Sequence, residues 1–321
     1  MASKAPGKHY RDGISISKLF KMFPDNETAK KWFEGIIWPE GPKCPYCGSM
    51  NVQDNIKHKS MTHRCRDCRS KPRFSLKTGT VMQSTKLDYK TWAIAIYMVT
   101  TNIKGVSSMK IHRELDITQK SAWHLAHRLR QTFESGSSVF LGPVEVDETY
   151  MGGKESNKHE SKKLKSGRGG VGKTAVVGIK DRKTNKVVAK VVPDTKKPTL
   201  QGFIGEQVNP DAEKFTDNNT AYNGLENRES VNHSIGEYVK GRVHTNGIES
   251  FWAMFKRAHK GTYHKMSPKH LQRYVVEFVG RHNQRTLDTL NQMNQVVDGM
   301  TGKRLTYRNL VRENGLDNFA R

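Results

Sequence analysis

The sequence has 321 residues, of which 35% are hydrophobic, and its 55 Lys and Arg residues against 31 Asp and Glu residues give a net charge of +24. This length is sufficient for two or three domains. We expect no transmembrane helix, because no run of roughly 18 apolar residues occurs, and no secretory signal. The positive charge is spread along the chain, which favours nucleic acid as the partner over a merely basic soluble protein.

Four cysteines form two Cys-x-x-Cys pairs that are separated by 17 residues. This spacing predicts a zinc ribbon, in which four thiolates bind one Zn²⁺ tetrahedrally. His58 and His63 lie nearby as alternative ligands, but four cysteines already complete such a site. A structural zinc is therefore favoured over a catalytic one, with these ligands: Cys44, Cys47, Cys65 and Cys68.

The segments around the cysteines have helical patterns. A short amphipathic helix is predicted over residues 26–37, and three more over residues 87–101, 104–115 and 118–133. The last two are joined by a tight turn and suggest a helix-turn-helix, with an ordinary helical linker domain as the alternative. We expect DNA contacts from the basic loop between the cysteine pairs and from the last helix, through Lys57, Arg64, Arg66, His124, Arg128 and Arg130.

The pattern changes to strands at residue 139. Strands are predicted in 139–153, 173–182, 186–192, 213–217 and 229–235, and helices in 197–208, 245–258 and 268–285. Thr184 and Asn185 form the turn of a hairpin between the second and third strands. We interpret the order as β-β-β-α-β-α-β-α, which is that of a ribonuclease-H-like α/β core with a mixed five-stranded sheet.

The segment GRGGVGKT, residues 167–174, fits the pattern of a phosphate-binding loop. A working loop of that kind follows a buried strand and opens a helix. Here the segment follows a charged stretch and precedes the strand-like AVVGIK. We therefore disfavour an ATP site and interpret the segment as a flexible basic loop that enters a strand, with Lys173 available to DNA phosphates.

Three acidic residues stand out in the strand-rich region. Asp147 lies within the first strand, Asp217 ends the fourth, and Glu249 lies one turn into the helix over 245–258. If the fourth strand pairs with the first and the helix crosses the sheet, the three carboxylates converge. Such a cluster needs cations to offset its repulsion, and paired Mg²⁺ or Mn²⁺ ions are the usual arrangement for attack at a phosphodiester. Lys256 shares a helix face with Glu249, and Arg257 and Lys260 extend the basic edge.

The stretches CPYCGS, VEVDETYMGGK, FTDNNTAY and the segment from His244 to Arg285 together resemble the bacterial insertion-sequence transposases of family fifteen-ninety-five, with an ISXO-like core. The resemblance covers residues from about 20 to about 290. It implies a DDE transposase that binds terminal inverted repeats, nicks the ends with water and joins the 3′-hydroxyls to target DNA. It also implies that Asp147, Asp217 and Glu249 bind the metal ions, with Lys256 as their basic partner.

Several alternatives stay open at this level. Some members of the family are thought to have Asn as the third position, which makes Asn246 an alternative to Glu249, and His244 is a candidate supporting residue. Tyr222 and Tyr263 remain open as nucleophiles. A DNA-binding regulator with an inactive nuclease-like domain is the main alternative function, and loss of function on substituting Asp147 or Asp217 discriminates it from the transposase.

The domain organisation follows from these segments. We predict an N-terminal segment over 1–25, a zinc ribbon over 26–80, a helical DNA-binding region over 81–136, a catalytic domain over 137–288 and a basic helical tail over 289–321. We expect a cytoplasmic protein at the bacterial nucleoid that acts as a homodimer or larger oligomer on DNA and requires no ATP.

Overall fold

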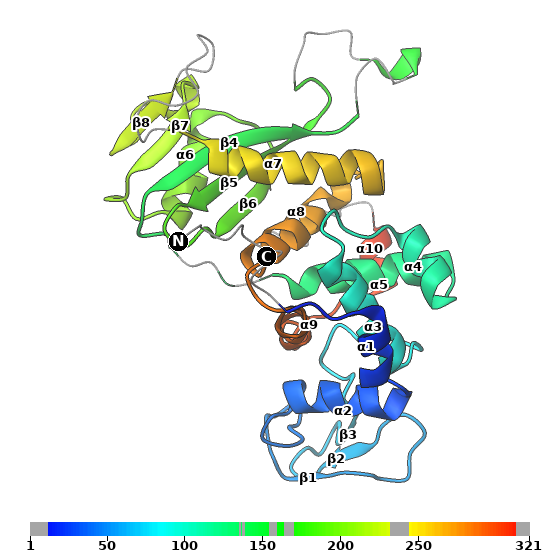
Figure 1. Cartoon of the computed structure of the whole chain (residues 1–321). Coiled ribbons are helices and arrows are strands. Elements are labelled where there is room, and N and C mark those ends of the chain that lie inside the picture. Colours follow the sequence, from blue (N-terminus) through cyan, green and yellow to red (C-terminus); the bar gives the residue numbers. More distant parts are fainter. Residues whose placement is uncertain are drawn as a thin grey trace. The chain divides into compact units, whose positions relative to one another are not determined.

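The structure is a computed structural model that describes residues 12–134, 136, 139–153, 159–163, 170–231 and 244–312. Two compact units make up the chain (Figure 1). The first combines Met1–Glu134 with Gln284–Arg312, and the second combines Ser135–Asn283 with Glu313–Arg321. None of the helices in the described part of the chain has both the length and the apolar character needed to span a bilayer.

The first unit begins with α1 (Ile16–Met22) and α2 (Asn26–Ile37), and α2 has the predicted bounds. Asp25 caps α2 by accepting a hydrogen bond from the backbone N–H of Thr28 at 2.7 Å, which satisfies a donor that the first turn leaves open. A three-stranded antiparallel sheet follows, with β1 (Val52–Gln53), β2 (His63–Cys65) and β3 (Arg73–Phe74) in that order.

The helical part of this unit contains α3 (Tyr89–Thr101), α4 (Ser108–Leu115) and α5 (Gln119–Thr132). Asp116 adopts a left-handed conformation with φ 48° between α4 and α5, and Thr118 then caps α5. The predicted helix, tight turn and second helix are therefore confirmed as elements.

Two C-terminal helices also belong to the first unit. They are α9 (Thr289–Asp298) and α10 (Tyr307–Val311). Met293, Val296 and Val297 of α9 are fully buried, and α9 contacts α2, α3 and α5. The predicted tail over residues 289–321 is thus part of a folded core as far as residue 312.

The second unit is built on a five-stranded mixed sheet in the order β6-β5-β4-β7-β8. β4 (Val144–Met151), β5 (Thr174–Asp181) and β6 (Val187–Val192) form an antiparallel meander. After α6 (Lys197–Gln207), β7 (Lys214–Asp217) returns beside β4 in parallel, and β8 (Arg228–Val231) pairs in parallel with β7. The predicted placement of the fourth strand beside the first is confirmed.

One predicted helix is absent. The interpreted order β-β-β-α-β-α-β-α implies a helix between the fourth and fifth strands, although no segment was assigned to it. Only the 3₁₀ turn η3 (Thr220–Tyr222) and short turns connect β7 to β8. The part of the fifth predicted strand that follows residue 231 lies outside the described residues, as do residues 167–169 of GRGGVGKT. The described remainder of that segment leads into β5, a strand, as expected.

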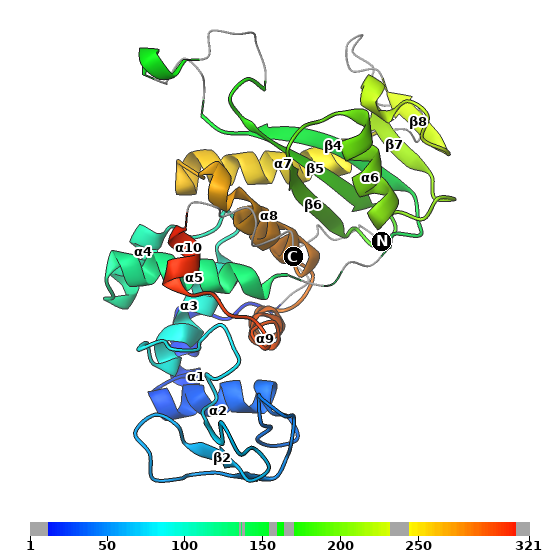
Figure 2. The same ribbon diagram turned by 180° about the vertical axis from the view of Figure 1, so that it is seen from behind.

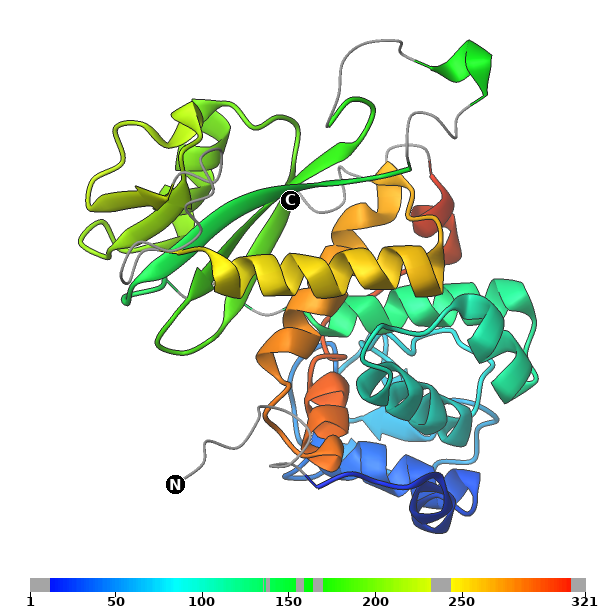
Figure 3. The ribbon, with the colours of Figure 1, turned by 45° about the horizontal axis from the view of Figure 1, so that its top comes forward.

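Helices cover both faces of the sheet (Figures 1 and 2). One face packs Val144, Val146 and Val177 against Leu200 and Phe203 of α6. The other face packs against α7 (Asn246–Ala258) and α8 (Pro268–Asn283). The π-helical turn η5 (His259–Tyr263) lies between these helices in the sequence. α7 runs beside β4 (Figure 3). The short helix η2 (Glu160–Lys162) lies in the connection from β4 to β5.

Gly178 allows α7 to approach the sheet closely. A Cβ atom at this position would lie 2.5 Å from Cζ2 of Trp252 and 3.1 Å from Cδ1 of Ile248, both on α7. Gly178 is also the cross-strand partner of Asp147 in the β4–β5 ladder. The absence of a side chain on β5 therefore determines how near α7 comes to the strand that carries Asp147.

Candidate active site and metal centre

The four cysteine sulfurs gather at one point, and all of them lie within 4.8 Å of one another. Sγ of Cys44 is 3.7 Å from Sγ of Cys68, and Sγ of Cys47 is 3.6 Å from Sγ of Cys65. A zinc tetrahedron with Zn–S bonds of about 2.3 Å has S···S edges of about 3.8 Å, so the cluster fits the ion. Gly48 has φ 76°, and its N–H donates to the carbonyl of Cys44, which turns the first pair inward.

The two nearby histidines are engaged elsewhere. His63 is buried and stacks on Phe74 with ring centroids 5.5 Å apart. The Nδ1 atom of His58 accepts backbone N–H groups of Ser60 and Met61. Neither histidine belongs to the cysteine cluster, in agreement with an all-cysteine site.

In the second unit, Asp147 and Asp217 lie on neighbouring parallel strands. The register pairs Glu145 of β4 with Phe215 of β7. Side chains alternate between the two faces of a strand, so residues two positions apart lie on the same face. Asp147 therefore lies on the face of Glu145, Asp217 lies on the face of Phe215, and these two faces are the same. This face is the one covered by α7, because Glu145 accepts a hydrogen bond from the backbone of that helix.

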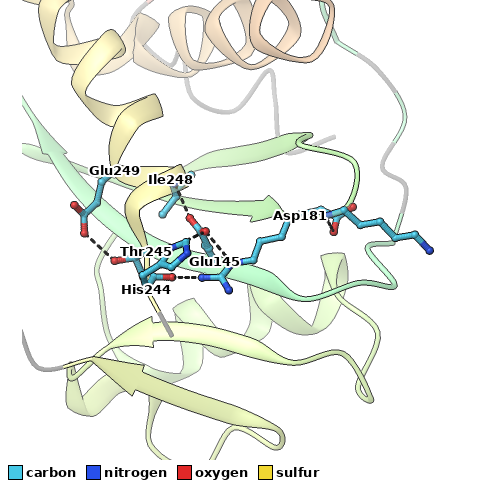
Figure 4. A network of polar contacts seen from close by, with 8 residues as sticks. Glu145, Asp181, His244, Thr245, Ile248 and Glu249 are labelled. Carbon is cyan, nitrogen blue, oxygen red and sulfur yellow. Dashed lines mark hydrogen bonds and ion pairs between the residues drawn. The ribbon is translucent and has the colours of Figure 1, made fainter. Parts of the chain in front are cut away.

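Glu145 anchors the N-terminus of α7 to the sheet (Figure 4). One carboxylate oxygen accepts the N–H of Ile248 at 2.9 Å, and the other is 2.9 Å from Nε of Arg182. Arg182 also donates to the carbonyl of His244 at 2.6 Å, and its guanidinium lies 3.9 Å from the ring centroid of Phe215. A buried acid at a helix N-terminus satisfies an otherwise open donor and opposes the helix dipole. It also places Glu249, in the first turn, above the same face.

The three predicted acids influence one another. Burial raises the pKa of Asp147 to about 8, with further contributions from the negative charges of Glu148, Asp217 and Glu249. Glu249 is thus close enough to Asp147 for its charge to contribute to this shift. Asn246, the alternative third position, is exposed at the start of α7.

The residues present fit divalent metal ions in chemical type, because carboxylate oxygens are the ligands that Mg²⁺ and Mn²⁺ prefer. Within the described ranges, however, the cysteine cluster is the only group of three or more such ligands that lies within 4.8 Å. The three carboxylates do not form a group as compact as that of the cysteine sulfurs.

The other predicted site residues on α7 and before it lie as follows. Lys256, Arg257 and Lys260 are exposed along the C-terminal part of α7 and η5. His244 is half-buried, and its Nδ1 atom is 3.4 Å from the carboxylate of Glu145. His244 thus contacts the carboxylate that holds the start of α7, and its role as a supporting residue stays a prediction.

Two tyrosines that the sequence left open as nucleophiles have structural partners. Tyr222 is fully buried, and its hydroxyl donates to Glu148. The hydroxyl of Tyr263 donates to Glu277 at 3.2 Å. Burial of Tyr222 argues against a nucleophilic role for it, whereas Tyr263 is half-buried and stays open.

Sequence reasoning missed two groups around the acids. The first is the helix anchor of Glu145 and Arg182, whose signal was the unbroken alternation of β4 that places Glu145 on the face of Asp147. The second is Glu148 with its donors Tyr222 and Asn219. An acid next to Asp147 was visible in the sequence, but its partners, more than 70 residues away, were not.

The predicted DNA contacts divide into two classes. Lys57, Arg64 and Arg66 of the zinc ribbon are exposed, and Lys173 is half-buried just before β5.

Arg128 and Arg130 are instead buried, with 7% and 3% of their surface exposed. Arg128 donates to the carbonyls of Leu305 and Gln83, and half-buried His124 also contacts the Leu305 carbonyl. We therefore correct the interpretation of these two arginines: both are buried, and Arg128 ties α5 to other segments of its own unit.

Comparison with known proteins agrees with this arrangement. Residues 139–283 match the ISXO2-like transposase domain, and residues 24–71 match the transposase zinc-ribbon domain. The chain is also 27% identical over 258 residues to an uncharacterized protein in transposable element ISH50 of Halobacterium salinarum, which covers 74% of this chain and 84% of that protein. No solved structure matches the chain.

The zinc-ribbon match lies within the first unit, and the transposase match lies within the second. The zinc-ribbon match spans the four-cysteine cluster, and the transposase match spans the five-stranded sheet with its acids. The chain therefore belongs to the IS1595 family of insertion-sequence transposases.

Proposed function

We propose that this transposase binds the terminal inverted repeats of its element, cleaves their ends and joins the resulting 3′-hydroxyls to target DNA. The observation that carries the proposal is the placement of Asp147 and Asp217 on adjacent parallel strands, on the face covered by the helix that carries Glu249. A sheet in the order β6-β5-β4-β7-β8 with acids at these positions supports a ribonuclease-H-like core.

Asp147, Asp217 and Glu249 are the residues that would hold two divalent ions, Mg²⁺ or Mn²⁺. When bound, such ions activate the attacking oxygen and stabilise the leaving 3′-oxygen. The chain's own contribution is positional: β4 and β7 fix two carboxylates side by side, and the Glu145 anchor holds the helix with the third. Lys256, Arg257 and Lys260 continue this helix as an exposed basic edge for DNA phosphates.

The zinc ribbon supplies a second DNA contact in this proposal. Arg64 of β2 and Arg73 of β3 are directly opposite each other in the sheet, and both are exposed. Like charges in facing positions are unfavourable unless an anion lies between them, and a DNA phosphate is such an anion. Four cysteines hold this small sheet together through one structural Zn²⁺.

The test is cleavage of a labelled duplex that carries one end of the element, in Mg²⁺ and without ATP. We expect cutting by the native chain and none by Asp217→Asn, with DNA binding retained by both. Glu249→Gln should also abolish cutting, while Asn246→Ala should retain it. Tight binding without cutting by any of these proteins would contradict the proposal and favour a DNA-binding regulator.

A further inference from the structure

Glu148 is a fourth acid, next to Asp147 in the sequence, but its side chain lies on the opposite face of β4. Val144 and Val146, which alternate with Asp147, pack on the α6 side of the sheet, and Glu148 continues their series. Both of its carboxylate oxygens accept hydrogen bonds there. Oε1 accepts from Nδ2 of Asn219 at 2.6 Å, and Oε2 accepts from the hydroxyl of Tyr222. Glu148 is thus engaged with the protein and turned away from the face of the three acids.

Asn219 links Glu148 to Asp217. Its backbone N–H donates to Oδ1 of Asp217 at 3.1 Å, while its side-chain amide donates to Glu148. The amide oxygen of Asn219 accepts the N–H of Ala221 at 3.0 Å, which fixes the orientation of the amide and leaves its NH₂ group toward Glu148. Both ends of the Asn219 amide are therefore engaged, and its orientation is fixed.

Tyr222 provides a rigid end for the link. Its ring has no exposed surface and packs in the same core cluster as Val144 and Val146. A buried ring has little freedom, so its hydroxyl holds Glu148 at a fixed position. The main chain at Asp217 is fixed separately, because Arg228 donates to the carbonyl of Asp217 at 2.9 Å and to Oγ1 of Thr216 at 2.8 Å.

We propose that Glu148, Asn219 and Tyr222 are positioning residues that orient the carboxylate of Asp217 for binding a divalent metal ion. This proposal rests on the proposed function, in which Asp217 is a metal ligand. The hydrogen bond from Asn219 occupies one oxygen of Asp217 in part and sets the direction of the other. Residues that orient a ligand in this way typically change metal affinity by roughly 10- to 100-fold when removed.

The three residues should affect metal binding in the order of their distance from Asp217 along this chain of hydrogen bonds. Asn219→Ala keeps the backbone N–H that bonds Asp217, but it removes the amide that connects this turn to Glu148 and that accepts the N–H of Ala221, so it loosens the turn that follows Asp217. Glu148→Gln keeps the shape but replaces a charged acceptor with a neutral one. Tyr222→Phe keeps the buried ring and removes one donor. We expect the concentration of Mn²⁺ at half-saturation to rise most for Asn219→Ala, by roughly 10- to 100-fold, less for Glu148→Gln and least for Tyr222→Phe.

The experiment is a titration of the zinc-loaded, full-length chain with Mn²⁺, followed through the rise in melting temperature without DNA. This readout is independent of catalysis. The matched control is Glu206→Gln, which neutralises an exposed carboxylate on α6 and should leave the midpoint unchanged. Tyr222→Phe tests the proposal even if a more disruptive variant fails to fold, because it retains the core packing.

Two results would overturn the proposal, and they are distinguishable. Native midpoints in all three variants, with binding by the native chain and its loss in Asp217→Asn, would contradict the positioning role alone. Absence of any Mn²⁺ effect on the native chain would contradict the metal site of the proposed function, and this proposal with it.

Discussion

The side chain of Asp147 occupies a position where folding disfavours a negative charge. Burial and three neighbouring carboxylates raise its pKa to about 8. The folded chain is therefore destabilised by the charged form of Asp147, and a bound cation would offset this effect. Acidic clusters of this kind are typical of functional sites, where stability is given up for chemistry.

Replacing Asp147 with Asn should raise the melting temperature of the zinc-loaded chain in Mg²⁺-free buffer at neutral pH. The asparagine removes the cost of burying a carboxylate, which is the larger cause of the raised pKa, and then its repulsion by the neighbouring acids. Each kcal/mol corresponds to roughly 2–4 °C for a domain of this size. The same variant should gain less from added Mg²⁺ than the native chain does. Asp211→Asn, at an exposed position, is the control. A lower melting temperature for Asp147→Asn than for the control would contradict this interpretation.

Buried and exposed arginines should behave in opposite ways. Arg128→Ala removes a buried guanidinium and its bonds to two carbonyls, so we expect a loss of about 2 kcal/mol or more in the free energy of unfolding. Arg66→Ala, at an exposed position of the zinc ribbon, should weaken DNA binding with little effect on stability. Denaturant unfolding and a DNA-binding titration measure both quantities. A stable Arg128→Ala chain with weakened DNA binding would restore the original interpretation of α5.

At the scale of elements, α7 depends on two contacts with the sheet. The Glu145 carboxylate accepts a hydrogen bond from its N-terminal turn. Gly178 has no side chain and so leaves room for the ring of Trp252. Together they set the height and direction of the helix above β4. Because Glu249 lies in the first turn, a shift of the helix moves it relative to Asp147.

Gly178→Ala should therefore reduce stability and cleavage together. The added Cβ atom would lie 2.5 Å from Cζ2 of Trp252, and overpacking of this kind costs about 1–3 kcal/mol. Gly205→Ala is the matched control, because it lies on exposed α6 surface with nothing within 4 Å of the new atom and should stabilise the helix by about 0.5–1 kcal/mol. Equal melting temperatures and equal cleavage rates for the two variants would contradict the role of Gly178.

Most elements could be predicted from the sequence, because their signals are local. The hydrophobic period and the cap at Asp25 define α2, and alternation defines β4 and β5. The 3₁₀ turn η3 in place of a helix was not predictable in this way. It depends on Asn219 and Tyr222, whose side chains bond to Glu148 on another strand, and such contacts between distant segments leave no periodic signal.

At the scale of the whole molecule, the order of segments in the sequence does not indicate which segments fold together into each unit. Residues 284–312 return to the first unit, although the second unit separates them in sequence from its other residues. A basic helical tail was predicted over residues 289–321, but neither the apolar face of α9 nor its packing against α2, α3 and α5 was predicted. The buried Arg128 has the same origin, since one of its acceptors, the Leu305 carbonyl, comes from this C-terminal segment.

Strand transfer is the reaction that we propose for the acids on the sheet of the second unit. Its most direct test is a joining reaction between a labelled, pre-cleaved end of the element and a plasmid target, in Mg²⁺ without ATP. The native chain should produce labelled joint molecules, and Asp217→Ala should produce none while still binding the end. Joint molecules formed equally well by Asp217→Ala, or only when ATP is added, would contradict the assignment of the chemistry to this site.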